Sequence, residues 1–326
     1  MFDLDSVLSQ EMFDWITDRR VGEPDRVVTI AKKRKRRKRL SPKTRLHVIA
    51  ADHPARRVTH GPGNPLTMSH RRDFLGRIVR VLGNDGADGV MASMDVLEEL
   101  LILGDVLRDH RGRAFFDDKL LIASINRGGL AGSKWELDDP ITGPDADTCE
   151  EYRLDGAKVL LRVLDDDERS LATLKMAADV VTRMNERGVR TFVEPLPMIR
   201  KDGKLVVDTR PSEIARLVGV ASALGSSSRH LWLKLPYCSD FGMVARATSL
   251  PILLLGGESA GDPTKLLREV DAALGAGANV RGAMAGRNVM YPGEGRDPLA
   301  AARAMSAIIH EGLGVDAAAA ILEREG

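Results

Sequence analysis

Short apolar segments alternate with longer amphipathic segments along most of this chain, and this alternation limits the folds that it can form. The short segments have the length and composition of strands, whereas the longer ones repeat their apolar residues with a period of about 3.6, as helices do. Eight segments are expected to form strands: His47–Asp52, Gly89–Ser93, Leu120–Ile125, Ala157–Val163, Arg190–Glu194, His230–Leu235, Pro251–Gly256 and Arg281–Gly286. The expected helices include Arg71–Leu82, Ser170–Glu186, Pro211–Leu224, Pro263–Leu274 and Pro298–His310.

Eight strand–helix units predict an α/β protein of the (β/α)8 TIM-barrel class, with all strands parallel. An open, doubly wound sheet would show the same alternation. It is disfavoured because no glycine-rich nucleotide-binding fingerprint follows the first strand. Barrels of this class typically have about 250 residues. Since the chain has 326 residues, it has room for an extension as well.

Residues 1–45 are expected to form an N-terminal extension, and residues 46–326 the barrel. The extension contains an amphipathic segment around Val7–Ile16 and an uninterrupted run of basic residues at 32–39. Such runs are usually solvated, and some contact an acidic neighbouring subunit. The run also resembles an RNA-binding patch, although no aromatic residues are interleaved with it.

Composition indicates a soluble globular protein of the size of an enzyme. The formal net charge is +1, so no overall field attracts nucleic acid. The two cysteines, Cys149 and Cys238, are too few for a disulfide framework and lack metal-ligand spacing. The acidic start of the chain does not resemble a signal peptide, and no apolar run has the length of a membrane span. We therefore expect a cytoplasmic protein that does not contact membranes.

Charged residues at strand ends are the candidates for catalysis, because the C-terminal ends of barrel strands converge on one mouth. Lys234 lies in an apolar strand, where desolvation favours the unprotonated amine that a Schiff base requires. Lys158 and Glu194 lie on the two preceding strands and can meet Lys234 inside the barrel. A carboxylate between two lysines can transfer protons. The alternatives are a buried structural ion pair and, for Lys234, a lysine that reaches to solvent from a strand end.

The turns after the last two strands are candidates for a phosphate site, since this is where barrels often bind phosphate through backbone N–H groups. The expected phosphate ligands are Gly256, Gly257, Gly286 and Arg287. Asp52 closes the first strand and is expected to orient a substrate hydroxyl or to pair with a catalytic lysine. The adjacent His53 has no second histidine at a ligand spacing, so no metal is expected.

These motifs resemble those of class I aldolases. Four segments are similar to the archaeal-type fructose-bisphosphate aldolases, and the similarity extends from about residue 46 to 310: Ala51–His53, Lys234–Tyr237, Gly256–Gly257 and Gly286–Asn288. Leu196 occupies the position of the acid/base tyrosine of that group and cannot transfer a proton. The segments Gly156–Leu161 and Val193–Leu196 instead resemble tagatose-bisphosphate aldolases and the aldolase domain attached to some 5-dehydro-2-deoxygluconokinases of inositol catabolism.

The resemblance implies that Lys234 forms the Schiff base and that Glu194 and Lys158 transfer protons. It implies cleavage of 5-dehydro-2-deoxy-6-phosphogluconate to dihydroxyacetone phosphate and malonate semialdehyde, without a cofactor. Further substrate contacts are expected among Arg56, Asn126, Arg127 and Arg162. A homo-oligomer is also expected. The alternatives are another class I aldolase, acting on a sugar bisphosphate, deoxyribose phosphate or sulfo-sugar phosphate, and a non-catalytic barrel that binds phosphate or RNA.

Overall fold

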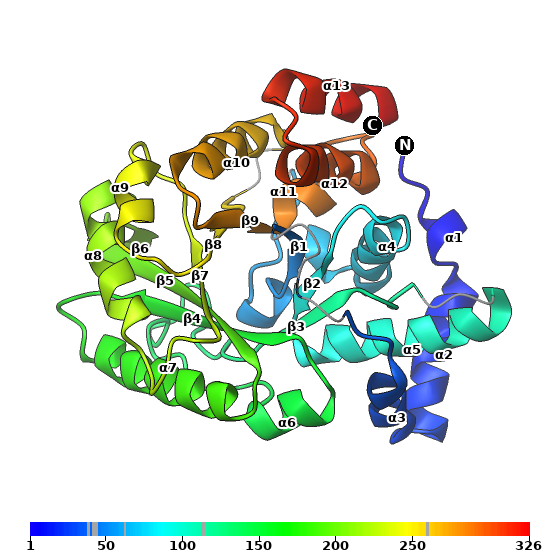
Figure 1. The fold of residues 1–326 in the computed structure, drawn as a ribbon. Coiled ribbons are helices and arrows are strands. Elements are labelled where there is room, and N and C mark those ends of the chain that lie inside the picture. Colours follow the sequence, from blue (N-terminus) through cyan, green and yellow to red (C-terminus); the bar gives the residue numbers. More distant parts are fainter. Residues whose placement is uncertain (38–39, 41–44, 62, 112–114, 259–260) are drawn as a thin grey trace.

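The structure, a computed structural model, describes residues 1–37, 40, 45–61, 63–111, 115–258 and 261–326 (Figure 1). Its parallel strands follow the order β4-β3-β2-β1-β9-β8-β7-β5, and β4 also pairs with β5, which closes the barrel. The strands are β1 (Leu46–Ala51), β2 (Gly89–Ala92), β3 (Leu120–Ser124), β4 (Gly156–Val163), β5 (Arg190–Lys201), β7 (Leu231–Leu235), β8 (Ile252–Leu255) and β9 (Val280–Ala285). The predicted (β/α)8 barrel is confirmed.

Helices surround the barrel, as Figure 1 shows. They are α4 (Arg71–Leu82), α5 (Met94–Arg111), α6 (Ala146–Glu151), α7 (Glu168–Glu186), α8 (Pro211–Ser222), α9 (Phe241–Arg246), α10 (Thr264–Ala276), α11 (Arg287–Met290), α12 (Pro298–Ser306) and α13 (Val315–Glu325). The predicted helices correspond to α4, α7, α8, α10 and α12. The last of these continues into a π-helical turn at Ala307–Glu311, which accounts for the longer prediction.

The interior of the barrel is filled by apolar side chains from alternate strand positions. One buried cluster contains Val48, Ala50, Met91, Ile122, Phe192, Leu253 and Met284. Successive strand residues point to opposite faces, so residues two positions from a cluster member also face inward. The barrel is therefore a packed core over these positions.

The fifth barrel strand is longer than predicted. It was expected to end at Glu194, but β5 continues to Lys201 and pairs antiparallel with β6 (Lys204–Val207). The hairpin turn consists of Asp202 and Gly203, which both have positive φ, at 50° and 73°. An Asp-Gly pair between two strand segments is a strong hairpin signal, and it was available in the sequence.

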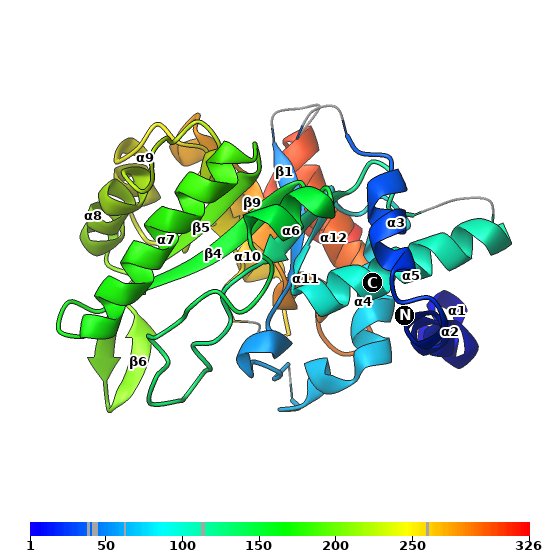
Figure 2. The ribbon, with the colours of Figure 1, turned by 90° about the horizontal axis from the view of Figure 1, so that it is seen from below.

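The N-terminal segment packs on one side of the barrel. Its helices are α1 (Leu4–Val7), α2 (Gln10–Gly22) and α3 (Arg26–Lys33), which contact α4 and α5. Figures 1 and 2 both place them beside α5. Among the described residues, no helix combines the length and the apolar character that a membrane span requires. Cys149 and Cys238 are both buried and unbridged.

The basic run pairs with acidic groups of the same chain. The Arg34 guanidinium is 2% exposed, lies 2.9 Å from an Asp155 carboxylate oxygen and donates to the carbonyl of Lys119 at 2.7 Å. Arg36 lies 3.0 Å from the other Asp155 oxygen, and Arg37 lies 2.9 Å from Asp88. Lys32 and Lys35 form exposed pairs, with Glu151 and Asp118. Two further members of the run, Lys38 and Arg39, lie outside the described residues.

The partners of the run share one location. Asp88, Lys119 and Asp155 immediately precede β2, β3 and β4, so the run lies against the N-terminal ends of three neighbouring strands. Arg34 is the most buried contact there. Because the ion pair is buried, removal of one partner leaves an uncompensated charge in a poorly solvated site.

We expect Arg34→Met to lower the free energy of unfolding by about 1.5–3 kcal/mol, since Asp155 loses its buried partner and keeps only the more exposed Arg36. The matched control is Lys35→Met, which removes an exposed charge of the same run and should change stability little. Urea unfolding followed by circular dichroism measures both. Equal midpoints for the two variants would contradict a structural role for the buried pair.

Candidate active site

The strand register points both lysines and Glu194 into the barrel. Lys158 lies directly opposite Phe192 on the neighbouring strand, and Lys234 lies opposite Leu253. Residues opposite each other in a sheet point to the same face, and both apolar partners belong to the interior cluster. Glu194 is two residues beyond Phe192 and faces inward for the same reason. The three predicted catalytic side chains therefore lie together.

One carboxylate oxygen joins the two lysines. Glu194 Oε2 lies 2.7 Å from Lys158 Nζ and 3.1 Å from Lys234 Nζ. Asp52 Oδ2 lies 3.3 Å from Lys158 Nζ. Lys158 thus contacts two carboxylates and is 1% exposed, whereas Lys234 pairs with one carboxylate of the described residues, that of Glu194. All four residues line a cavity of about 150 Å³.

Burial and charge act against each other on the ionisation of these groups. Burial alone would raise the pKa of Glu194, but attraction to Lys158 and Lys234 outweighs it and brings the pKa down to about 2. The pKa of Asp52 is likewise held well below its usual value, because Arg127 and Lys158 outweigh the effect of burial. For Lys158, burial dominates over the two carboxylates and lowers the pKa. Both carboxylates are therefore anionic at neutral pH.

Asp52 is fixed by a set of neighbours at the ends of β1 and β3. Ser124 Oγ donates to Asp52 Oδ2 at 2.6 Å. Arg127 donates to the Asp52 carbonyl through Nε at 3.1 Å and NH2 at 2.8 Å, and lies 3.2 Å from its carboxylate. These bonds hold the carboxylate next to Lys158, which agrees with the predicted pairing of Asp52 with one of the lysines.

The predicted phosphate ligands line the same cavity. Gly257 has φ +62°, which favours glycine, and a Cβ atom on Gly286 would lie 2.1 Å from the carbonyl oxygen of Ala50, so that position requires glycine. Arg287 donates to the carbonyl of Gly257 at 3.2 Å and to Nε2 of His60 at 2.6 Å. This guanidinium is thus oriented beside exposed backbone, an arrangement suited to a phosphate.

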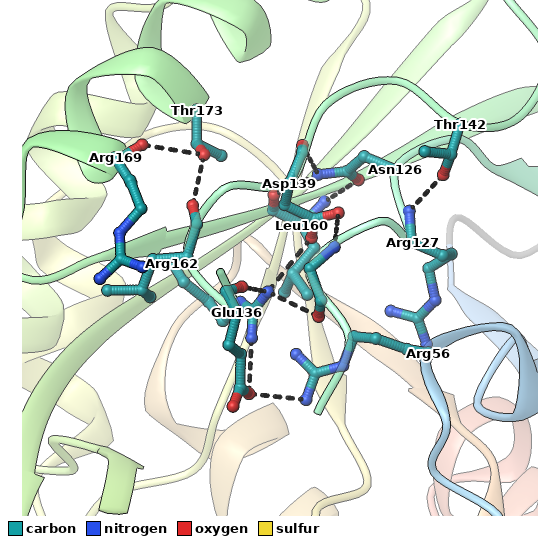
Figure 3. A network of polar contacts seen from close by, with 12 residues as sticks. Arg56, Asn126, Arg127, Glu136, Asp139, Thr142, Leu160, Arg162, Arg169 and Thr173 are labelled. Atoms are coloured by element: carbon teal, nitrogen blue, oxygen red, sulfur yellow. Dashed lines mark hydrogen bonds and ion pairs between the residues drawn. The ribbon is translucent and has the colours of Figure 1, made fainter. Parts of the chain in front are cut away.

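The remaining predicted substrate contacts separate into two groups (Figure 3). Arg56 and Arg127 line the cavity, whereas Asn126 and Arg162 do not. Asn126 donates to the carbonyl of Leu160 at 2.7 Å and accepts from its N–H at 2.7 Å, which ties the end of β3 to β4. Arg162 is 2% exposed and pairs with two carboxylates, as described below. We therefore do not assign substrate contacts to Asn126 or Arg162.

His53 lies in the cavity wall, where burial lowers its pKa to about 3 and keeps the imidazole neutral. The described part of the chain contains no group of three or more His, Cys, Asp or Glu side chains arranged to hold a metal. The structure thus offers charged and hydrogen-bonding groups for acid/base chemistry.

Three polar residues near the cavity were not among the site residues predicted from the sequence. Ser124 holds Asp52, His60 accepts from Arg287, and Glu136 pairs with Arg56 at 3.6 Å and with Arg162 at 2.8 Å. Ser124 is the next-to-last residue of the predicted strand Leu120–Ile125 and lies two positions beyond the inward-facing Ile122, so strand periodicity could have identified it. His60 and Glu136 lie in loops, where no periodicity marks them.

The depressed pKa of Glu194 predicts a loss of stability in acid. Its contribution is fully present above its ordinary pKa of 4.5 and disappears as the pH falls through about 2. Between these values, wild type should lose more stability than Glu194→Gln, which has no carboxylate to protonate. Urea unfolding at several pH values measures the two slopes. Parallel slopes would show that the Glu194 pKa is not depressed.

The comparisons with known proteins agree with this architecture. A synthase of Streptomyces griseus, named 2-amino-4,5-dihydroxy-6-oxo-7-(phosphonooxy)heptanoate synthase, is 28% identical over 274 residues, covering 82% of this chain and 85% of the synthase. A Schiff-base-forming fructose-1,6-bisphosphate aldolase superposes with a TM-score of 0.59 and 20% identity, over 87% of this chain and 100% of its own. At this identity the likeness concerns the fold.

A stronger likeness is to the crystal structure of Cgl0159 from Corynebacterium glutamicum. It has a TM-score of 0.86 and 32% identity, and the match covers 94% of this chain and 99% of that one. The model of the Cgl0159-like family matches residues 44–307. This match spans all eight barrel strands and every site residue described above, and the chain therefore belongs to the Cgl0159-like family.

Proposed function

We propose that this protein is a class I aldolase, a carbon–carbon lyase that cleaves a phosphorylated keto-sugar through a Schiff base on Lys234. The observation that carries the proposal is the pair of buried lysines joined by one carboxylate oxygen, at 2.7 and 3.1 Å. These groups share a cavity with Gly256, Gly257 and Arg287. The cavity thus combines an amine nucleophile, a proton-transfer group and a phosphate-binding wall.

The contacts favour Lys234 over Lys158 as the nucleophile. Lys158 is held between Asp52 and Glu194, so it would have to break two ion pairs to attack a ketone. Among the described residues, Lys234 has one carboxylate partner, Glu194. Lys158 is better suited to a proton-transfer role, because its lowered pKa makes its ammonium a stronger acid than an ordinary lysine.

The reaction can be followed through these side chains. The Lys234 amine adds to the ketone, and Glu194 with Lys158 supplies the proton with which the hydroxyl of the carbinolamine leaves as water. Glu194 then accepts the proton of the hydroxyl two carbons from the former ketone, and the intervening carbon–carbon bond breaks. Its electrons pass to the iminium nitrogen, so an aldehyde and an enamine form. Return of the proton to the enamine carbon and hydrolysis release the keto-phosphate and regenerate Lys234.

For the substrate, we propose 5-dehydro-2-deoxy-6-phosphogluconate, which gives dihydroxyacetone phosphate and malonate semialdehyde. The resemblance of the fourth and fifth strands to the inositol-catabolism aldolase domain supports it. The name of the Streptomyces griseus relative describes a phosphorylated ketone that also carries hydroxyls and a carboxylate. Both molecules contain a phosphate next to the ketone and a carboxylate at the other end. The proposed substrate class is therefore a keto-phosphate that carries a carboxylate at the opposite end.

Borohydride trapping tests the Schiff base. Incubation with dihydroxyacetone phosphate and borohydride should attach one keto-phosphate to Lys234, identified by peptide mass spectrometry. Lys234→Met should give no adduct. Lys158→Met is the matched control, since it removes the other lysine from Glu194 but leaves the nucleophile, and its adduct should remain on Lys234. An adduct on another residue of the wild-type protein, or none, would refute the proposal.

Kinetics of Glu194→Gln test the proton-transfer role. The variant keeps the shape of the side chain but cannot accept the hydroxyl proton, so kcat should fall by about 10²–10⁴-fold. KM should change much less, because Glu194 is not among the proposed phosphate ligands. Steady-state cleavage coupled to reduction of dihydroxyacetone phosphate measures both constants. An unchanged kcat would exclude Glu194 as the acid/base group.

A further inference from the structure

Three arginines lie at or near the cavity on the side of β1, β3 and β4, and two of them are already held by their own chain. Arg127 uses Nε and NH2 on the Asp52 carbonyl and also faces the Asp52 carboxylate. Arg162 lies 2.8 Å from Glu136 and 3.3 Å from Asp139, and its NH2 donates to the carbonyl of Gly129 at 3.1 Å. Both guanidinium groups therefore serve the structure.

Arg56 differs from these two. Among the described residues, the one carboxylate within ion-pair distance of its guanidinium is Glu136, at 3.6 Å. That carboxylate lies closer to Arg162, at 2.8 Å, so it is already partly neutralised. The Arg56 side chain lines the cavity and is 18% exposed, which leaves its donors accessible from the cavity.

The backbone holds Arg56 in a defined place. It ends a short 3-10 turn, Pro54–Arg56, that directly follows Asp52 and His53. Its carbonyl accepts from the N–H of Ala131 at 3.1 Å, which ties this turn to the loop after β3. Figure 3 shows the Arg56 side chain reaching toward Glu136. The guanidinium is thus presented on the β3–β4 side of the cavity.

The order of strands around the barrel indicates which part of a substrate would lie near Arg56. Going round the closed sheet, β9 and β8 carry the phosphate wall, β7 carries Lys234, β5 carries Glu194 and β4 carries Lys158. A substrate of the proposed class has phosphate, ketone, cleaved bond and terminal group in that same order. The group farthest from the phosphate therefore reaches the β3–β4 side, where Arg56 lies.

We infer that Arg56 binds a carboxylate at the end of the substrate opposite the phosphate, and so determines which aldehyde the enzyme releases or accepts. This inference rests on the proposed function. A guanidinium matches a carboxylate in a two-pronged hydrogen bond. A single accessible arginine beside the acidic Glu136 suits a group with one negative charge better than a phosphate with two.

The test uses the condensation reaction, in which dihydroxyacetone phosphate is offered with freshly prepared malonate semialdehyde or with propanal, its neutral three-carbon counterpart. Wild type should prefer malonate semialdehyde in kcat/KM by about 10- to 100-fold, the range expected for hydrogen bonds to a charged group. Arg56→Met should bring the ratio close to one, chiefly through KM for malonate semialdehyde. Arg56→Lys should restore part of the preference.

The matched control is Arg57→Met, which removes the neighbouring, exposed guanidinium and should leave the preference unchanged. Borohydride trapping of dihydroxyacetone phosphate on Lys234 must persist in Arg56→Met, which separates loss of the subsite from loss of the fold. An undiminished preference in a variant that still traps would overturn the inference and leave the aldolase proposal intact. A wild-type preference for glyceraldehyde 3-phosphate over malonate semialdehyde would overturn the carboxylate assignment. Absence of trapping in wild type would instead refute the aldolase proposal itself.

Discussion

The position of both buried lysines depends on the carboxylate of Glu194. Two ammonium groups repel each other and lose their hydration when they enter a barrel, so neither is stable there without a shared counter-charge. Glu194 supplies it through one oxygen, at 2.7 and 3.1 Å, and Asp52 compensates Lys158 from the other side. The two lysines can therefore lie close together because the register of the strands places the Glu194 carboxylate between them.

Much of this arrangement was predictable from the sequence. Lys158, Glu194 and Lys234 each interrupt an apolar strand segment, and once eight such segments are taken as a barrel, their convergence follows from the two-residue period of strands. The pairing distances were not predictable, because they depend on the register between neighbouring strands, which places Lys158 opposite Phe192 and Lys234 opposite Leu253. The strand containing Glu194 was ended too early because prolines follow it, although the Asp202–Gly203 turn indicated the hairpin.

The different roles of the three arginines could not be predicted from the sequence. Arg56 follows β1, Arg127 follows β3 and Arg162 lies in β4, and nothing in their local sequence distinguishes them. The distinction arises from loops, which bring Glu136 and Asp139 to Arg162 and the carbonyl of Asp52 to Arg127. The same limit applied to the basic run at 32–39. Its local sequence gave no sign that Arg34 is buried, because the partner Asp155 lies 121 residues further along the chain.

That separation has a consequence for the synthesis of the protein. Arg37 meets Asp88 across 51 residues, and Arg34 meets Asp155 across 121, so the run can be neutralised only in stages, as β2 and then β4 are completed. At translation rates of about 5–20 residues per second, the last of these partners follows Arg34 by roughly 6–24 s. Throughout this interval Arg34 lacks the carboxylate that it pairs with in the folded barrel.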